Sequence, residues 1–283
     1  MLKKISLLAL VTISGINLMA QTDTTKKTPQ NTGDTMRIGN IIILKNGGAG
    51  TTGTTYSDWD INIYRHNPGK PKNLSTSWLI FDFGFNNFTD NTNYSSADVA
   101  VYAPGSNADW FGLRNNKSVN VNLWIFMQRL NIYKHVVNLK YGAGFEWYNF
   151  RFDDNIRYYK NPPRIEMDTV ITYSKNKLAT DYVTIPLMLN FNFTPNNPEY
   201  KSFGISAGIS AGYLYNSRNK YISDETGKQK TKGDLGLEDF KLAYIAEVQL
   251  GPIKLYGSYA TQTMYKKGLD HTPYAVGLRL SHW

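Results

Sequence analysis

The stretch FGISAGISAGY, residues 203–213, decides the fold because it alternates between two kinds of side chain. Gly and Ser fill the even positions, and the odd positions are Phe203, Ile205, Ala207, Ile209, Ala211 and Tyr213. A period of two places the two sets on opposite faces of a β-strand. One face of this strand is therefore apolar, and the other is small and polar.

The same alternation recurs on both sides of this stretch. It covers residues 78–86, 118–128, 137–148, 183–193, 242–250, 253–261 and 274–282. Apolar alternation fits either a soluble barrel with an apolar interior, as in lipocalins, or a membrane barrel with an apolar exterior. Strand positions that face water usually carry long charged side chains, whereas here Gly, Ser and Asn dominate. A narrow polar lumen explains that composition, so we expect a membrane barrel.

The lengths of the connections support this interpretation. Long connections (residues 87–117, 149–177, 216–239 and 262–271) alternate with short ones (129–135, 194–201 and 251–252). Outer-membrane barrels combine long external loops with short periplasmic turns. The sequence therefore predicts an all-β, transmembrane, antiparallel up-and-down barrel of about eight strands over residues 76–283, in the bacterial outer membrane.

The N-terminal part predicts export. Lys3 and Lys4 precede an apolar run over residues 5–11, and Ala20 is a small residue before Gln21. This is the layout of a cleaved signal peptide over residues 1–20. Residues 21–75 are expected to form a short polar periplasmic linker with two short strands, at 38–45 and 59–65. No run of 18 or more apolar residues follows, which excludes helical membrane spans.

Composition limits the possible chemistry. The chain has no Cys, so neither disulfides nor thiolate metal sites can form. Aromatic residues make up 14% of the chain, and we expect them to mark the two membrane interfaces. The external set is Trp147, Phe150, Tyr182, Tyr213, Tyr215, Tyr259 and Tyr274, and the periplasmic set is Phe191, Phe193, Tyr200 and Phe203. Pro186 lies inside a strand and predicts a bulge or an irregular pair there.

Several motifs carry a family resemblance. The segments WLIFDFGFNNF (residues 78–88), YVTIPLMLNF (182–191) and FGISAGISAGY, with the aromatic Trp283, resemble the eight-stranded outer-membrane barrels of Bacteroidota, the PorT-like and OmpX/OmpA-like group. The resemblance implies fold and compartment, with assembly by the barrel assembly machinery, but no activity. The usual assembly signal places apolar residues on the same strand face as the terminal aromatic residue. Here Leu278 and Leu280 alternate onto the face opposite Trp283, which departs from that signal.

Candidate catalytic and ligand residues are scarce. The four histidines, His66, His135, His271 and His282, belong to no metal-ligand or nucleophile motif. Some outer-membrane barrels modify lipid A with His, Ser and an acid, so His271 with loop serines is an alternative site, but we interpret it as a loop histidine in water. Residues 86–98 lack the EF-hand spacing and are interpreted as a solvated loop. We expect no cofactor.

The external loops are basic in places. One contains Arg151, Arg157, Lys160, Arg164, Lys175 and Lys177, and another contains Lys228, Lys230 and Lys232. Phosphates of lipopolysaccharide lie at this level, so outer-membrane lipid and lipopolysaccharide are the expected partners, and nucleic acid is not. Interspersed acids also fit an ordinary solvated surface.

Inward parity predicts a lumenal charge network of Asp82, Lys140, Glu146, Lys241, Glu247, Lys254 and Arg279. Isolated charges in a narrow lumen are costly, so we expect them to pair across strands and close the pore. Barrel closure makes the first and last strands neighbours, which favours an Asp82–Arg279 pair with Glu247 as the competing partner. The expected function is therefore non-enzymatic: envelope integrity, loop display, or association with an envelope or secretion protein. A lipid A modifying enzyme is the alternative.

Overall fold

A computed structural model describes residues 35–38, 41–44, 72–197 and 201–280. The chain divides into two units, residues 1–67 and 68–283. In the first unit, β1 (Thr35–Ile38) pairs antiparallel with β2 (Ile41–Leu44). The strand predicted over residues 38–45 is confirmed in part as β2, and its partner is the preceding strand β1. The predicted signal peptide, the strand at 59–65, Tyr200 and Trp283 lie outside the described residues.

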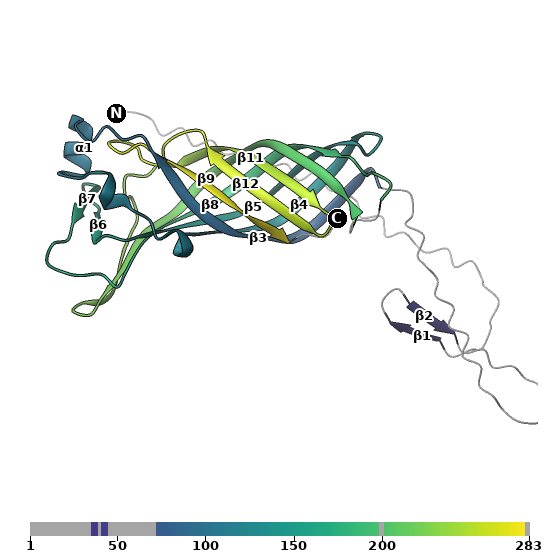
Figure 1. The fold of residues 1–283 in the computed structure, drawn as a ribbon, viewed down its shortest axis with the longest axis horizontal. Coiled ribbons are helices and arrows are strands. Elements are labelled where there is room, and N and C mark those ends of the chain that lie inside the picture. Colours follow the sequence, from purple (N-terminus) through teal and green to yellow (C-terminus); the bar gives the residue numbers. More distant parts are fainter. Residues whose placement is uncertain (1–34, 39–40, 45–71, 198–200, 281–283) are drawn as a thin grey trace, which may run out of the picture. The chain divides into compact units, whose positions relative to one another are not determined.

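Eight strands of the second unit form an antiparallel barrel in which neighbours in sequence are neighbours in space (Figure 1). They are β3 (Leu74–Asp90), β4 (Val119–Tyr133), β5 (Val137–Phe152), β8 (Lys175–Asn192), β9 (Phe203–Ser223), β11 (Phe240–Leu250), β12 (Ile253–Ala260) and β13 (His271–Leu280). Pairing of β13 with β3 and of β8 with β9 closes the ring. The predicted up-and-down fold of about eight strands is confirmed.

The seam between β13 and β3 depends on two glycines. Gly84 lies directly opposite Gly277. A Cβ at Gly84 would lie 2.3 Å from the Val276 carbonyl oxygen, and one at Gly277 would lie 2.3 Å from the Phe83 carbonyl oxygen. The two backbones approach so closely that no larger residue fits at either position.

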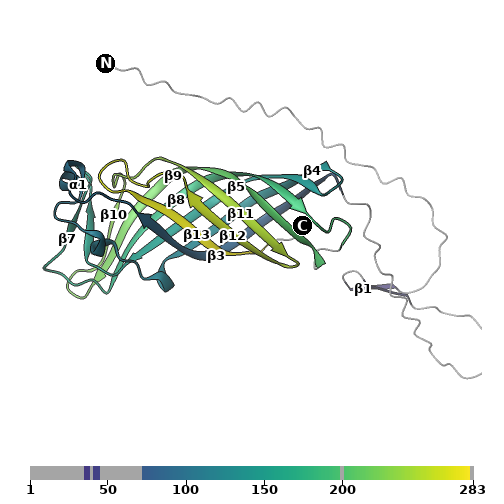
Figure 2. The same cartoon turned by 45° about the horizontal axis from the view of Figure 1, so that its top comes forward.

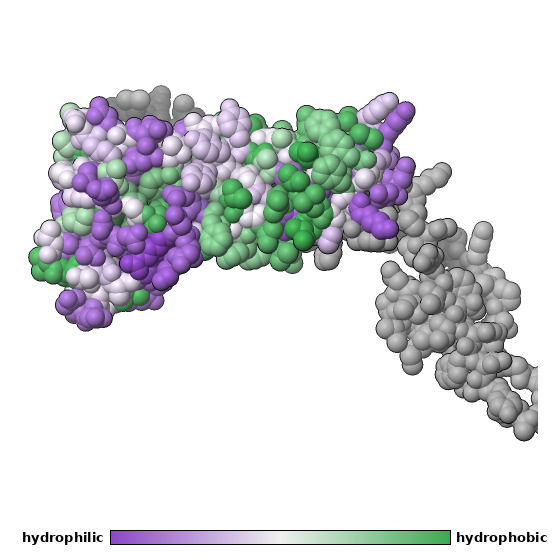
Figure 3. All heavy atoms as spheres, in the orientation of Figure 1, coloured by the Kyte–Doolittle hydropathy of each residue, from purple (hydrophilic) through white to green (hydrophobic). Residues whose placement is uncertain are grey.

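An apolar band surrounds the barrel wall. Phe83, Ile185, Leu242 and Leu278 are among the large side chains that point outward and are exposed, and hydrophobic residues gather over the middle of the barrel in Figure 3. Only lipid or detergent can cover such a band. No helix among the residues that the structure describes is long and apolar enough to cross a membrane.

The aromatic boundary of the band differs in part from the prediction. Tyr213, Tyr215 and Tyr259 are exposed outward at the external side, as expected. Phe150 and Tyr182 are buried, so their assignment to the external ring is wrong. Both stand at inward positions of their strands, and the period of two outweighs aromatic preference for the interface.

Local irregularities change the parity of two strands. Leu79 has a φ of 53°, and the β4–β5 register shifts between Trp124 and Phe126. Beyond this shift Met127 faces inward and Gln128 does not, so the alternation predicted over residues 118–128, which puts Gln128 on the polar, lumenal face, is wrong at its end. Pairing of β8 with β5 is interrupted at Pro186, but the register is unchanged there and the β8 bulge lies at Asp181 and Tyr182.

The long connections fold into a cap at one end of the barrel (Figures 1 and 2). They contain α1 (Ala97–Tyr102), the short helices η1 (Ala108–Phe111) and η2 (Asn115–Lys117), the hairpin of β6 (Ile156–Tyr159) and β7 (Arg164–Met167), and β10 (Gly227–Lys232), which pairs antiparallel with the end of β9. Because long loops of outer-membrane barrels are external, we expect the cap to lie outside the cell.

The glycine seam generates the first prediction. Gly84→Val should prevent close pairing of β3 with β13 and destabilise the barrel by about 1 to 3 kcal/mol, a typical cost of overpacking. Gly257→Val is the matched control, because a Cβ at Gly257 has only one neighbour, at 3.9 Å. Urea unfolding in lipid vesicles measures both. Equal stability of the two variants would contradict the seam.

Candidate functional site

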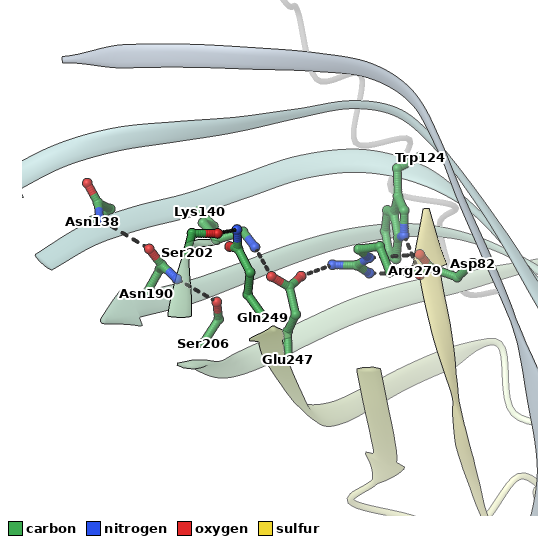
Figure 4. Close-up of polar contacts among 10 residues, drawn as sticks. All are labelled: Asp82, Trp124, Asn138, Lys140, Asn190, Ser202, Ser206, Glu247, Gln249 and Arg279. Atoms are coloured by element: carbon green, nitrogen blue, oxygen red, sulfur yellow. Dashed lines mark hydrogen bonds and ion pairs between the residues drawn. The ribbon is translucent and has the colours of Figure 1, made fainter. Parts of the chain in front are cut away.

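The lumen is lined by polar and charged side chains from every part of the ring. All seven charged residues predicted to face it are buried: Asp82, Lys140, Glu146, Lys241, Glu247, Lys254 and Arg279. Four are cationic and three are carboxylates, so the charges nearly balance. Figure 4 shows part of this network, which we call the lumenal network.

Arg279 is the centre of the lumenal network. Its Nε and Nη2 atoms each donate to Asp82 at 2.7 Å, and its Nη1 donates to Glu247 at 2.5 Å. The structure thus pairs Arg279 with both carboxylates that the sequence suggested. Asp82 also accepts a hydrogen bond from Trp124 Nε1 at 2.7 Å and one from Asn122 at 3.2 Å. A bidentate, fully hydrogen-bonded pair offsets much of the cost of burying its charges.

Two ion pairs cross the lumen. Lys140 on β5 binds Glu247 on β11, and Lys241 on β11 binds Glu146 on β5. Strands β8 and β9 separate β5 from β11 in the ring, so these pairs span the interior rather than join neighbouring strands. Together they form reciprocal bridges at two levels of the barrel.

Aromatic rings surround the second bridge. The Lys241 ammonium lies 4.5 Å from the centroid of the Tyr148 ring and 4.9 Å from that of Tyr182. It also donates to the Tyr148 hydroxyl at 3.2 Å, and Thr184 donates to Glu146 at 2.9 Å. These contacts fill the lumen on the cap side of the network and add cation–π attraction.

Neutral hydrogen bonds continue toward the periplasmic end (Figure 4). Asn138 donates to Asn190 at 3.1 Å, Asn190 donates to Ser206 at 3.0 Å, and Gln249 donates to Ser202 at 2.5 Å. These bonds join neighbouring strands of the ring, and their side chains line the lumen below the ion pairs. An eight-stranded barrel is only wide enough for side chains to fill, and here ion pairs hold them in place.

Sequence reasoning missed the aromatic members of this site. Trp124, Tyr148 and Tyr182 face inward, each buried beside a charge of the lumenal network. Trp124 and Tyr148 share the inward parity of Asn120 and Glu146, so the alternation itself could have identified them. They were not predicted to face the lumen, because large aromatic side chains were expected at the membrane interfaces.

The cap has a hydrophobic core of its own, and His271 lies within it. His271 is 0% exposed and stacks on Phe88 with centroids 4.2 Å apart. The rings of Phe111 and Tyr265 also pack against the His271 ring in edge-on contacts. The interpretation of His271 as a loop histidine in water is wrong, because the loops fold over it.

Asp90 organises the start of the first long loop. It accepts hydrogen bonds from the Tyr94 hydroxyl at 2.6 Å and the Thr92 amide at 2.9 Å, and it lies 3.4 Å from His271 Nε2. Burial opposes ionisation, but these bonds hold the pKa of Asp90 well below its usual range. Burial lowers the pKa of His271 despite the neighbouring Asp90 and Asp270. Residues 86–98 are thus partly built into the cap, rather than simply solvated.

Metal chemistry has no support in this region. Among the residues that the structure describes, no three His, Asp or Glu side chains are grouped so as to hold a metal ion.

Comparison with family models agrees with the geometry. A family model described as outer membrane protein beta-barrel domain matches residues 77–262. No curated protein matches. A solved structure of Ail, the attachment invasion locus protein of Yersinia pestis, in complex with the heparin analogue sucrose octasulfate, is 13% identical, with a TM-score of 0.32, and the match covers 73% of this chain and 98% of that one.

The central ion pairs generate the second prediction. Arg279→Met should cost about 3 to 5 kcal/mol, because it leaves Asp82 and Glu247 without their shared cation. Arg164→Met is the control: its pair with Glu166 is partly exposed and should contribute about 0 to 1 kcal/mol. Urea unfolding in vesicles, followed by Trp fluorescence, measures both. The double variant Asp82→Asn, Arg279→Met should lose less than the sum of the single losses. Strict additivity would show that the residues do not interact.

The cap generates a pH prediction. His271 has a folded-state pKa below its unfolded value, so its contribution to stability is complete above about pH 6.5 and is lost as pH falls. Asp90 stays ionised throughout this range. Amide hydrogen exchange of residues 264–272, relative to a barrel-wall peptide, should therefore accelerate between pH 7.5 and 5. His271→Phe should abolish the dependence, and its persistence in that variant would exclude His271 as the titrating group.

Proposed function

The chain belongs to the outer membrane protein beta-barrel domain family, and on that premise we propose that it is a closed, non-enzymatic barrel that displays a folded extracellular cap. The carrying observation is the lumenal network, in which Lys140–Glu247 and Lys241–Glu146 join opposite walls. Solute transport is disfavoured because a passage would have to break both buried pairs.

The cap supports a role in display. Tyr158 and Tyr265, from different loops, share a hydrogen bond of 2.7 Å, and Tyr102 donates to the Leu235 carbonyl at 2.5 Å. Loops joined in this way present a defined surface rather than separate flexible tips. Val101 and Val170 are apolar and strongly exposed on this surface, 79% and 89%, respectively. Exposed apolar side chains outside the lipid are candidate contacts for an envelope partner.

The alternative, a lipid A modifying enzyme, is less well supported. Its candidate histidine, His271, is enclosed by Phe88, Phe111 and Tyr265. A general base must reach the proton that it removes, and a buried ring cannot meet a lipid substrate without opening the cap. The resemblance to PorT-like barrels of Bacteroidota rests on the sequence motifs. A role in secretion, which this resemblance suggests, stays a prediction.

Site-specific photo-crosslinking in the native envelope tests the proposal. A photoreactive residue at Val101 or Val170 should capture a protein partner, whereas one at Tyr133, the last residue of β4 at the other end of the barrel, should not. Purified protein incubated with lipid A should leave the lipid unchanged by mass spectrometry. Crosslinks confined to Tyr133 would contradict display, and deacylated or acylated lipid A would contradict the non-enzymatic assignment.

A further inference from the structure

Strands β8, β9 and β10 continue beyond the external aromatic ring and carry a strongly basic outer surface. Each basic side chain on it is exposed or half-buried. We call this surface the basic face; it consists of Lys175, Lys177, Arg218, Lys220, Lys228, Lys230 and Lys232. Hydrophilic residues gather at this end of the barrel in Figure 3.

Strand register places these cations directly opposite one another. Lys177 pairs with Lys220, and Lys220 pairs with Lys230, so one row crosses three strands. Arg218 pairs with Lys232 in the next row. Like charges directly opposite in a sheet are destabilising. The fold therefore maintains a charge concentration that opposes its own stability.

Few acids neutralise the basic face. Arg218 forms an ion pair with Asp181, and in the part of the chain that the structure describes no other member has an ion-pair partner. Lys177 donates instead to the neutral Asn149 side chain at 2.7 Å. Partial burial, with Lys175, Arg218 and Lys220 nearby, lowers the pKa of Lys177 to about 8. A bound anion would relieve this repulsion.

Protection of a sheet edge explains only part of the pattern. Lysines on an exposed edge strand prevent pairing with other chains, which accounts for β10. Lys177 and Lys220 lie where both edges of their strands are already paired. Their charges protect no edge and need another explanation.

We propose that the basic face binds the phosphate groups of lipopolysaccharide in the surrounding outer leaflet, an inference that rests on the outer-membrane orientation of the proposed function. Tyr215 marks the external interface, and Arg218 and Lys220 follow it by three and five residues on the same strand. With about 3.3 Å per residue and a strand tilt of about 40°, they lie roughly 8 to 13 Å above that interface. The face points sideways over the lipid, where membrane-anchored phosphates reside. Lysine ammonium groups bind phosphate as point charges.

Binding of purified lipid A to the detergent-solubilised protein tests this proposal. The triple variant Lys177→Gln, Lys220→Gln, Lys230→Gln should bind bisphosphorylated lipid A at least about tenfold more weakly, given roughly fivefold per lysine near an anionic surface. The control Lys117→Gln, Lys160→Gln, Lys267→Gln removes the same charge from other external loops and should change affinity by less than about threefold. Native mass spectrometry at constant salt reports the bound fraction.

Three results would overturn the proposal. One is equal loss of binding in the two triple variants, and another is undiminished binding of lipid A whose phosphates have been removed. A third is binding of dextran sulfate without binding of lipid A, which would identify a soluble polyanion as the ligand. Heat-modifiable migration on gels shows that each variant is folded, and fractionation with the outer membrane tests the proposed function separately.

Discussion

The rest of the barrel depends on the two ion pairs that join β5 to β11 across the lumen. Eight strands enclose a space that only side chains can fill, so a charge placed there must find its partner on the facing wall. Lys140–Glu247 and Lys241–Glu146 do so in opposite directions, and Arg279 links Glu247 to Asp82 at the β13–β3 seam. The same network therefore specifies which strands face each other and fills the pore.

Because the lumen is closed, we expect the protein to act through the ends and the outer surface of the barrel. The strands extend past the membrane and carry a cap whose core includes His271, Phe111 and Tyr265. The basic face, which includes β10 of the cap, occupies the outer surface of the strands beyond the external aromatic ring. In our proposal the barrel serves as a support, with a surface for a protein partner on the cap and a surface for lipid phosphates at its side.

Period-two alternation predicted most of this architecture from sequence. Each of the eight strands was expected, and Asp82, Arg279 and Glu247 meet because the parity of their strands and the closure of the ring leave them few other neighbours. Errors arose where local signals were preferred to parity, as at Phe150 and Tyr182. Parity itself failed after the register shift near Trp124, because one extra residue exchanges the two faces of a strand.

The cap could not be predicted in the same way. Its core joins residues distant in sequence, such as Tyr158 and Tyr265, through loops without periodicity. The burial of His271 depends on those contacts, so its surroundings could not be read from neighbouring residues. The basic face was visible as separate charged loops, but only strand register shows that Lys177, Lys220 and Lys230 form one row.

Ionic current through the purified barrel in a planar lipid bilayer tests closure of the lumen most directly. At neutral pH the wild-type protein should insert without steady conductance, because buried ion pairs and aromatic rings occupy the pore. A stable ohmic current in the wild-type protein would show that the lumen is open and would contradict the central claim.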